Sequence, residues 1–368
     1  MVFSSCYTRR LMRILWLLFF LSISNAQILV ESGITHGGEI EFTSDQIYAA
    51  DSKSKVGGLR GSEFPAAVKM AEAVAKKCRA LGCKVTQVNG KWGKEFFVQL
   101  HDGWWFQISY DPLCVEIQTK PSTIQELYTH QDLKEELIFG SAREAGLESR
   151  PSRATHMNTG ARSAFGYDLR SLFNYFVDNA NHPELSSGVF RSNWNTSPPL
   201  ALSRIDLMTR IKDIQILIET GSIKSFSQLA NVIVDRLHSY FLNPQFNPKR
   251  NQDLTFRKLV SLTGTQEKPQ FAEIDVPFER RAVRAVRSFS EFILHAEMIE
   301  SRIAWIKVQP GFIPFKKKVP ELLGSYQRDV FFESWLKESG LSVDRYLPLI
   351  KASPARKPLN SCQKFYSN

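Results

Sequence analysis

Four short strand-like segments in this 368-residue chain place acidic, imidazole or amide side chains among apolar neighbours. They are GEIEF at 38–42, CVEI at 114–117, THMN at 155–158 and FAEIDV at 271–276. Successive side chains of a strand point to opposite faces, so residues two apart share a face, about 6.6–7 Å from each other. The sequence therefore predicts a sheet with one polar face, on which groups from distant parts of the chain meet.

The segments around these strands have mostly helical patterns. A hairpin is expected over 96–110, turning at Asp102-Gly103. Helices are expected over 62–81, 122–146, 167–180, 203–219, 225–241 and 278–307. Strands with crossing helices come first, a helix-rich half follows, and one strand comes late. This order predicts an α+β fold, in which a mostly antiparallel sheet carries the active site, helices flank it, and the C-terminal half is helix-rich.

The N-terminus has the three parts of a secretory signal peptide. Arg9, Arg10 and Arg13 precede an apolar run at 14–23, and Ser24-Asn25-Ala26 supplies small residues for cleavage. The apolar run is shorter than the about 20 residues of a membrane-spanning helix, although an uncleaved anchor stays an alternative. We expect a signal peptide over 1–26 and a secreted or periplasmic mature protein with no later transmembrane segment.

Composition indicates a folded chain, with 43% hydrophobic and 23% charged residues. We expect a catalytic domain over 27–315 and a C-terminal helical extension and tail over 316–368. The formal net charge of +10 fits an anionic substrate or an anionic envelope surface. No dense Lys/Arg stripe interleaved with aromatic residues is present, so we expect no nucleic-acid partner.

The mature chain holds four cysteines: Cys78, Cys83, Cys114 and Cys362. Disulfides are expected in an exported protein, and four cysteines allow three complete pairings, among which the sequence does not choose. A structural zinc site is not expected, because no CxxC pair occurs.

The converging acidic groups predict a divalent-cation site. A single Glu-x-Glu strand is usually just the wet face of a sheet. Several carboxylates and an imidazole on one face, however, repel one another unless cations lie among them. Hard oxygen ligands with one nitrogen suit Mg²⁺ or Mn²⁺ better than zinc. Two such ions can bridge phosphate oxygens during phosphoryl transfer.

In their order and spacing, these segments resemble the glutamine-synthetase-like carboxylate–amine ligases, especially the amidoligase and glutamate–cysteine ligase branches. The matching elements are GGEIEF at 37–42, WWFQISYDPLCVEIQTKP at 104–121, THMNTG at 155–160 and FAEIDVPFERR at 271–281. The resemblance spans most of the mature chain and depends on order and spacing, because none of these motifs is specific alone.

The resemblance implies a set of metal ligands: Glu39, Glu41, Glu116, His156 and Glu273. Glu116 and His156 are then the ligands nearer the nucleotide phosphates. Asn158, beside His156, is implied to contact the nucleotide or substrate. Arg280 and Arg281 are implied to neutralise a phosphate or acyl phosphate, or alternatively to cover a helix face. Two positions depart from the family pattern: Asn158 replaces a second histidine, and Asp275 stands where many relatives have arginine.

The reaction implied is ATP- and Mg-dependent: a carboxylate is phosphorylated, and an amine then attacks the acyl phosphate. The substrates would be small-molecule or peptide carboxylates and amines. Export conflicts with this expectation, since little ATP is present outside the cytoplasm. Two alternatives therefore stay open: a metal-dependent hydrolase on the same site, and a non-catalytic envelope- or peptide-binding protein. A cysteine hydrolase using Cys114 with His156 is a further alternative.

Export can be tested directly on secreted material. N-terminal sequencing should find Gln27 or a near neighbour as the first residue, because cleavage follows the small residues 24–26. An intact Met1 or Met12 in a soluble cytoplasmic fraction would contradict the predicted signal peptide.

Overall fold

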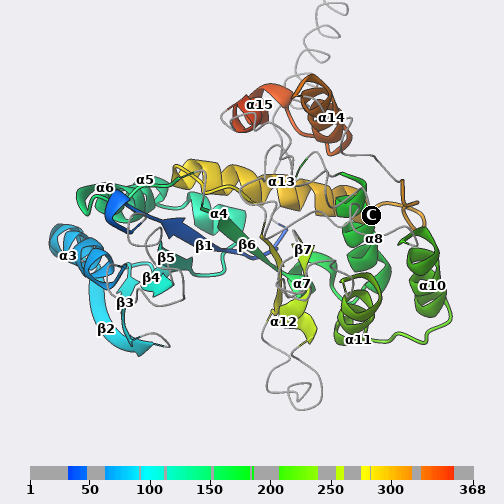
Figure 1. Ribbon diagram of the computed structural model, residues 1–368, viewed down its shortest axis with the longest axis horizontal. Helices are drawn as coiled ribbons and strands as arrows, with labels where there is room; N and C mark the ends of the chain where they lie inside the picture. Colours follow the sequence, from blue (N-terminus) through cyan, green and yellow to red (C-terminus); the bar gives the residue numbers. More distant parts are fainter. Residues whose placement is uncertain are drawn as a thin grey trace, which may run out of the picture. The chain divides into compact units, whose positions relative to one another are not determined.

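The structure is a computed structural model (Figure 1). It describes residues 32–47, 63–90, 93–111, 114–150, 153–182, 185, 207–238, 254–260, 275–281, 283–316 and 325–351. The chain divides into two compact units, Met1–Gly33 and Ile34–Asn368. All described helices and strands belong to the second unit. The predicted signal peptide at 1–26, Glu273 and Cys362 lie outside the described residues.

The described residues form an eight-stranded sheet with the order β2-β3-β4-β5-β1-β6-β8-β7. Every neighbouring pair of these strands is antiparallel. The strands are β1 (His36–Phe42), β2 (Lys84–Gly90), β3 (Gly93–Gln99), β4 (Trp105–Asp111), β5 (Cys114–Thr119), β6 (Thr155–Gly160), β7 (Leu254–Thr255) and β8 (Pro277–Arg280). The predicted α+β fold with an antiparallel sheet is confirmed.

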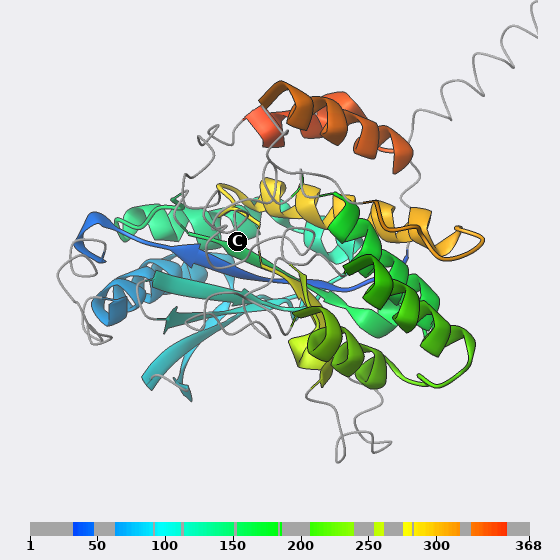
Figure 2. The ribbon, with the colours of Figure 1, turned by 45° about the vertical axis from the view of Figure 1, so that its right-hand side comes forward.

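Helices flank the sheet and dominate the second half of the chain (Figures 1 and 2). The first half contributes α3 (Glu63–Leu81), α4 (Ile124–Tyr128), α5 (Gln131–Glu135), a π-helical turn (Glu136–Gly140), α6 (Ser141–Glu144), α7 (Ala161–Phe165) and α8 (Leu169–Asn181). The second half contributes α10 (Leu207–Glu219), α11 (Phe226–Ile233), a second π-helical turn (Val234–His238), α12 (Arg257–Val260), α13 (Phe289–Lys307), α14 (Ser325–Glu338) and α15 (Val343–Lys351). Within the described residues, none of the helices combines the length and apolar character that crossing a membrane requires.

One face of the sheet is apolar and packs against α3 and α13. Ile40, Ile117 and Met157 point to this face and are fully buried. At the centre of the sheet, α13 lies so close to β1 that a Cβ on Gly38 would meet the ring of Phe292 at 2.5 Å. The alternation of side chains leaves Glu39 and Glu41 on the other face.

The predicted hairpin over 96–110 and the predicted helix over 62–81 are confirmed, but the late strand and helix are shifted. Of the strand expected at 271–276, the structure describes only Asp275 and Val276. These two residues precede β8 and are not part of a strand, so the expectation is wrong for them. Proline is tolerated at the first position of a strand, and Pro277 takes that position. The expected helix from 278 starts only at Phe289, where the Ser288 hydroxyl accepts a hydrogen bond from the Glu291 amide.

The structure gives the state of three of the four cysteines whose pairing the sequence left open. Cys78 and Cys83 form a disulfide that closes the C-terminal end of α3. Cys114 is buried and free.

Ion pairs link the C-terminal helices to buried residues of α13. Arg302 of α13 contacts Glu338 of α14 at 2.8 Å, and Glu297 of α13 contacts Arg345 of α15 at 2.8 Å. The proposed boundary between 27–315 and 316–368 stays a prediction.

The close approach of β1 and α13 predicts a cost for any side chain at Gly38. We expect Gly38→Ala to lower the free energy of unfolding by about 1–3 kcal/mol in urea denaturation, because the Phe292 ring must move. Gly311→Ala is the matched control, since a Cβ there meets nothing within 4 Å. Adding Phe292→Leu should recover part of the Gly38→Ala loss. Equal effects at Gly38 and Gly311 would contradict the packing argument.

Candidate functional site

The polar face of the sheet collects the predicted acidic residues from three neighbouring strands. Glu39 of β1 is paired in register with His156 of β6, and Glu41 of β1 with Glu116 of β5. Directly paired residues of antiparallel strands have their side chains on the same face. Four of the five predicted metal ligands are therefore brought together, while Glu273 lies outside the described residues.

The centre of this site is a group of three residues: Glu39, His156 and Glu279. The Nδ1 atom of His156 lies 2.8 Å from Glu39 Oε2 and 3.4 Å from Glu279 Oε1. One ligand atom from each residue lies within 4.8 Å of the others. Two carboxylates and one imidazole in this arrangement can bind a divalent cation, and they are the one such group among the residues that the structure describes.

Two cationic side chains border the centre on the side of β8 and α12. Lys258 Nζ lies 3.3 Å from Glu39 Oε1 and donates a hydrogen bond to Asn158 Oδ1 at 2.8 Å. Arg281 donates to Glu279 Oε1 at 2.5 Å. This edge of the site therefore carries positive charge within reach of an anionic group bound at the centre.

The charges at the centre stabilise one another. Burial alone would raise the pKa of Glu39, but the hydrogen bond and charge of His156, with the charge of Lys258, hold it well below its usual range. Burial alone would lower the pKa of His156, but its hydrogen bond to Glu39 and the charge of Glu279 raise it. Glu39 is therefore held ionised, as a carboxylate ligand must be, whereas His156 has to release its proton before its ring can bind a cation.

Glu41 and Glu116 extend the acidic region along β1 and β5. Glu41 Oε2 accepts a hydrogen bond from the backbone amide of Ala154 at 3.0 Å, and Gln118 donates to Glu116 Oε1 at 2.8 Å. Burial, followed by the charge of Glu39, raises the pKa of Glu116 to about 7. Glu116 can therefore exchange a proton near neutral pH.

The other predicted site residues are placed differently. Asn158 lies at the centre, where it donates to Glu39 Oε1 at 3.4 Å. Arg281 is beside Glu279, but Arg280 points to the opposite face, where it is buried and lies 3.3 Å from the Tyr175 hydroxyl. Arg280 therefore lies away from the carboxylates, and its place does not fit the implied role of neutralising a phosphate there.

The sequence reasoning missed Glu279 and Lys258. A strand signal was available for Glu279, because Pro277 marks a strand start and alternation from there places Glu279 and Arg281 on one face. Lys258 had no such signal, since it reaches the site from α12, a helix of only four residues.

Cys114 does not have the properties of a catalytic nucleophile. Burial, followed by the charges of Glu41 and Glu116, raises its pKa well above that of an ordinary thiol. Reactive cysteines instead have lowered pKa values and are accessible. The structure thus argues against the cysteine-hydrolase alternative.

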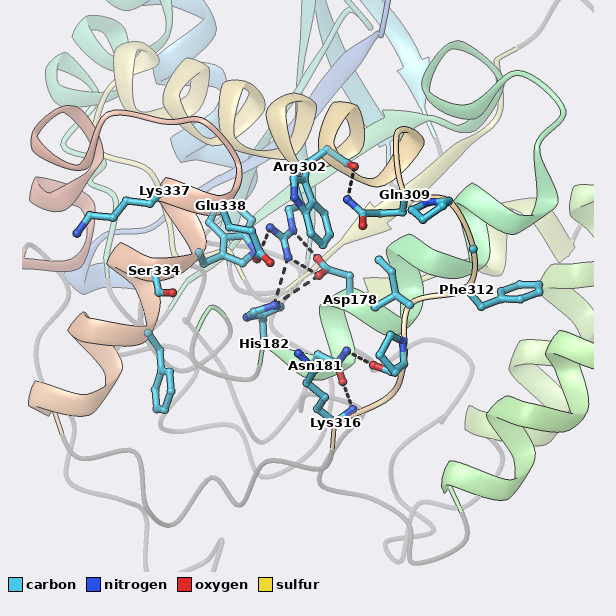
Figure 3. Close-up of a pocket in the computed structure, with 17 residues that line it drawn as sticks. Asp178, Asn181, His182, Arg302, Gln309, Phe312, Lys316, Ser334, Lys337 and Glu338 are labelled. Carbon is cyan, nitrogen blue, oxygen red and sulfur yellow. Dashed lines mark hydrogen bonds and ion pairs between the residues drawn. The ribbon is translucent and has the colours of Figure 1, made fainter.

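A cavity of about 1020 Å³ lies elsewhere, among α8, α13 and α14 (Figure 3). Arg302, which lines it, binds both carboxylate oxygens of Asp178 and contacts Glu338. Its guanidinium also stacks over Trp305, 3.8 Å from the ring centroid. Burial raises the pKa of Asp178, but Arg302 and His182 lower it to about 2. None of the residues that line this cavity belongs to the carboxylate site.

Comparison with known proteins gives limited information. No protein-family model and no curated protein matches this chain. Among solved structures, it is similar to a crystal structure of a novel glutamine synthase homolog, with 14% sequence identity and a TM-score of 0.38. The match covers 91% of this chain and 71% of that one. At this TM-score the likeness assigns no function, which must be inferred from the site itself.

The raised pKa of Glu116 predicts a pH-dependent stability. In the folded protein Glu116 keeps its proton up to about pH 7, whereas the unfolded chain releases it near the ordinary value of 4.5. This residue therefore costs stability progressively as pH rises from about 4.5 to about 7. Glu116→Gln should leave the free energy of unfolding nearly unchanged at pH 4.5. At pH 8 it should raise the free energy of unfolding by roughly 3 kcal/mol, because each pKa unit corresponds to about 1.36 kcal/mol.

Urea denaturation with EDTA at the two pH values measures this effect. Glu72→Gln, an exposed position on α3, should give the same small change at both. A gain at Glu116 that does not grow with pH would contradict the shift.

Proposed function

We propose that this chain is a divalent-metal-dependent enzyme of the carboxylate–amine ligase type. The observation that supports this best is the convergence of Glu39, His156 and Glu279, from three strands, on one ligand-binding position. The donor set fits Mg²⁺ or Mn²⁺, because two hard carboxylates and a single imidazole nitrogen would contact the ion. Lys258 lies 3.3 Å from Glu39 Oε1, so its ammonium group would share this carboxylate with the bound ion.

Glu39, His156 and Glu279 would hold the metal. Once bound, it would neutralise negative charge on phosphate or carboxylate oxygens. Lys258 and Arg281 would bind and orient the anionic substrate from the α12 side. Glu116 would take the proton released by the attacking amine, because its pKa of about 7 suits a general base near neutral pH. ATP is the phosphoryl donor that the family resemblance implies, and in this proposal it would phosphorylate the carboxylate that the amine then attacks.

A metal-dependent amide hydrolase on the same site is the second candidate. The Cys78–Cys83 disulfide favours it, because disulfides persist mainly in oxidising compartments outside the cytoplasm. That observation also supports the proposed export of the chain. The hydrolase would use the same metal ligands and would need no phosphoryl donor.

The metal site can be tested by thermal unfolding. Mg²⁺ or Mn²⁺ at ten times its Kd should stabilise the protein by about 1.4 kcal/mol, since it binds only the native state. Glu39→Gln should abolish this response, because it removes a charged ligand from the centre. Glu72→Gln, on the exposed face of α3, should keep the full response. Identical melting curves with and without millimolar Mn²⁺ in the wild type would favour a non-catalytic binding protein.

Turnover then separates the two enzyme candidates. A ligase releases inorganic phosphate from ATP only when a carboxylate and an amine are both present. A hydrolase releases an amine from an amide without ATP. In either case Glu39→Gln should remove activity while Glu72→Gln retains it. Metal-dependent stabilisation without either reaction, over panels of carboxylates, amines and peptide amides, would contradict the enzyme proposal.

A further inference from the structure

The polar face of the sheet continues from the metal ligands across three further strands. Glu39 is paired in register with Gln118 of β5, Gln118 with Gln107 of β4, and Gln107 with Phe97 of β3. Neighbouring strands lie about 4.8 Å apart, so this row reaches roughly 14 Å from Glu39 to Phe97. Trp105 lies beside Phe97 on the same face, with ring centroids 5.4 Å apart.

The two glutamines of the row present their carbonyl oxygens. Gln118 donates its amide nitrogen to Glu116, and Gln107 donates its amide nitrogen to Glu95. An amide nitrogen only donates hydrogen bonds, so these contacts turn the nitrogen of each amide group toward the glutamate and leave its oxygen on the other side. No hydrogen-bond donor among the described residues contacts the carbonyl oxygens. Gln118 is exposed and Gln107 is half-buried, so a ligand with N–H groups can reach both.

Charge divides the face into two halves around Glu39. The half toward α12 holds the cations Lys258 and Arg281. The half toward β3 holds the acids Glu116 and Glu95 together with the glutamine oxygens. A phosphate chain would be repelled along this second half, whereas ammonium and amide N–H groups would be attracted. The half-buried aromatic pair at its far end suits an apolar or aromatic side chain.

We propose that the row Gln118–Gln107–Phe97, with Trp105, binds the amine substrate, and that this substrate is a short peptide-like amine with an apolar or aromatic side chain. Its N–H groups donate to Gln118 and Gln107, its side chain packs on the Phe97–Trp105 pair, and its reactive amine faces Glu39. That the bound amine is a substrate rests on the proposed function. That this surface binds a peptide-like amine can be tested independently of it.

Calorimetric titration of the whole protein with leucyl-phenylalaninamide tests the proposal. This dipeptide amide has a free amine, N–H groups and an aromatic ring, but no carboxylate. Trp105→Ala should weaken its binding about tenfold, and Trp105→Phe should restore most of the affinity. Gln118→Met, which keeps length and removes the acceptor, should weaken binding about fivefold. Tyr167→Ala, at a position 83% exposed, is the control and should change nothing.

Two comparisons decide the outcome. Glycyl-glycinamide, which lacks the ring, should bind weakly and be insensitive to Trp105→Ala. ADP should bind equally to the wild type and to Trp105→Ala. Unchanged affinity of leucyl-phenylalaninamide in Trp105→Ala, or a loss of ADP binding in that variant, would overturn the proposal.

The metal response keeps this test separate from that of the proposed function. Trp105→Ala and Gln118→Met should retain the Mg²⁺ shift in melting temperature, which also verifies that both variants are folded. A wild type without that shift would refute the metal-dependent enzyme even if the dipeptide amide binds. A normal shift with the same dipeptide affinity in wild type and variants would refute only the peptide-like substrate.

Discussion

A carboxylate at the middle of a sheet needs a positively charged or hydrogen-bonding partner. Glu39 has two, one from the neighbouring strand and one from a helix beside the sheet. It lies on the central strand pair with its side chain only 20% exposed, so an unpaired charge there would be destabilising. His156 on the next strand and Lys258 from α12 supply the compensating positive charge. Their positions in turn determine where Glu279, Asn158 and Arg281 can lie. The polar face is therefore organised around this one partly buried acid.

The opposite face shows how the same sheet can carry such a site. Apolar side chains of β1, β5 and β6 pack against α3 and α13, and two buried residues of α13, Glu297 and Arg302, form ion pairs with the C-terminal helices. Gly38 allows α13 to approach β1 closely behind Glu39. This packing gives the acidic centre a rigid support, which a metal-binding or catalytic arrangement needs to hold its ligands within a fraction of an ångström.

Much of the fold could be predicted because local patterns determine it. The alternation in 38–42 and 114–117, the Asp-Gly turn and the glycine helix ends each act over a few residues, and each lies where it was expected. Glu39, Glu41, Glu116 and His156 were found for the same reason. Glu279 was missed because the chain was expected to be helical from 278, and Lys258 because a tertiary contact brings it to the site. Arg280 points away from the site because it directly follows Glu279, and successive side chains of a strand point to opposite faces.

The strand order has a consequence for how the molecule can assemble. β1 is the first strand along the chain, yet it lies in the interior of the sheet between β5 and β6. Its neighbours therefore emerge only after about a third of the chain has been made, and β8, which carries Glu279, emerges much later. Pairing between strands that are distant in sequence makes folding slow, because the chain loses entropy when a long loop closes before the strand contacts stabilise it. A nascent or truncated chain would expose the polar strand of β1 with its acids unpaired, and the candidate metal centre would be among the last features to form.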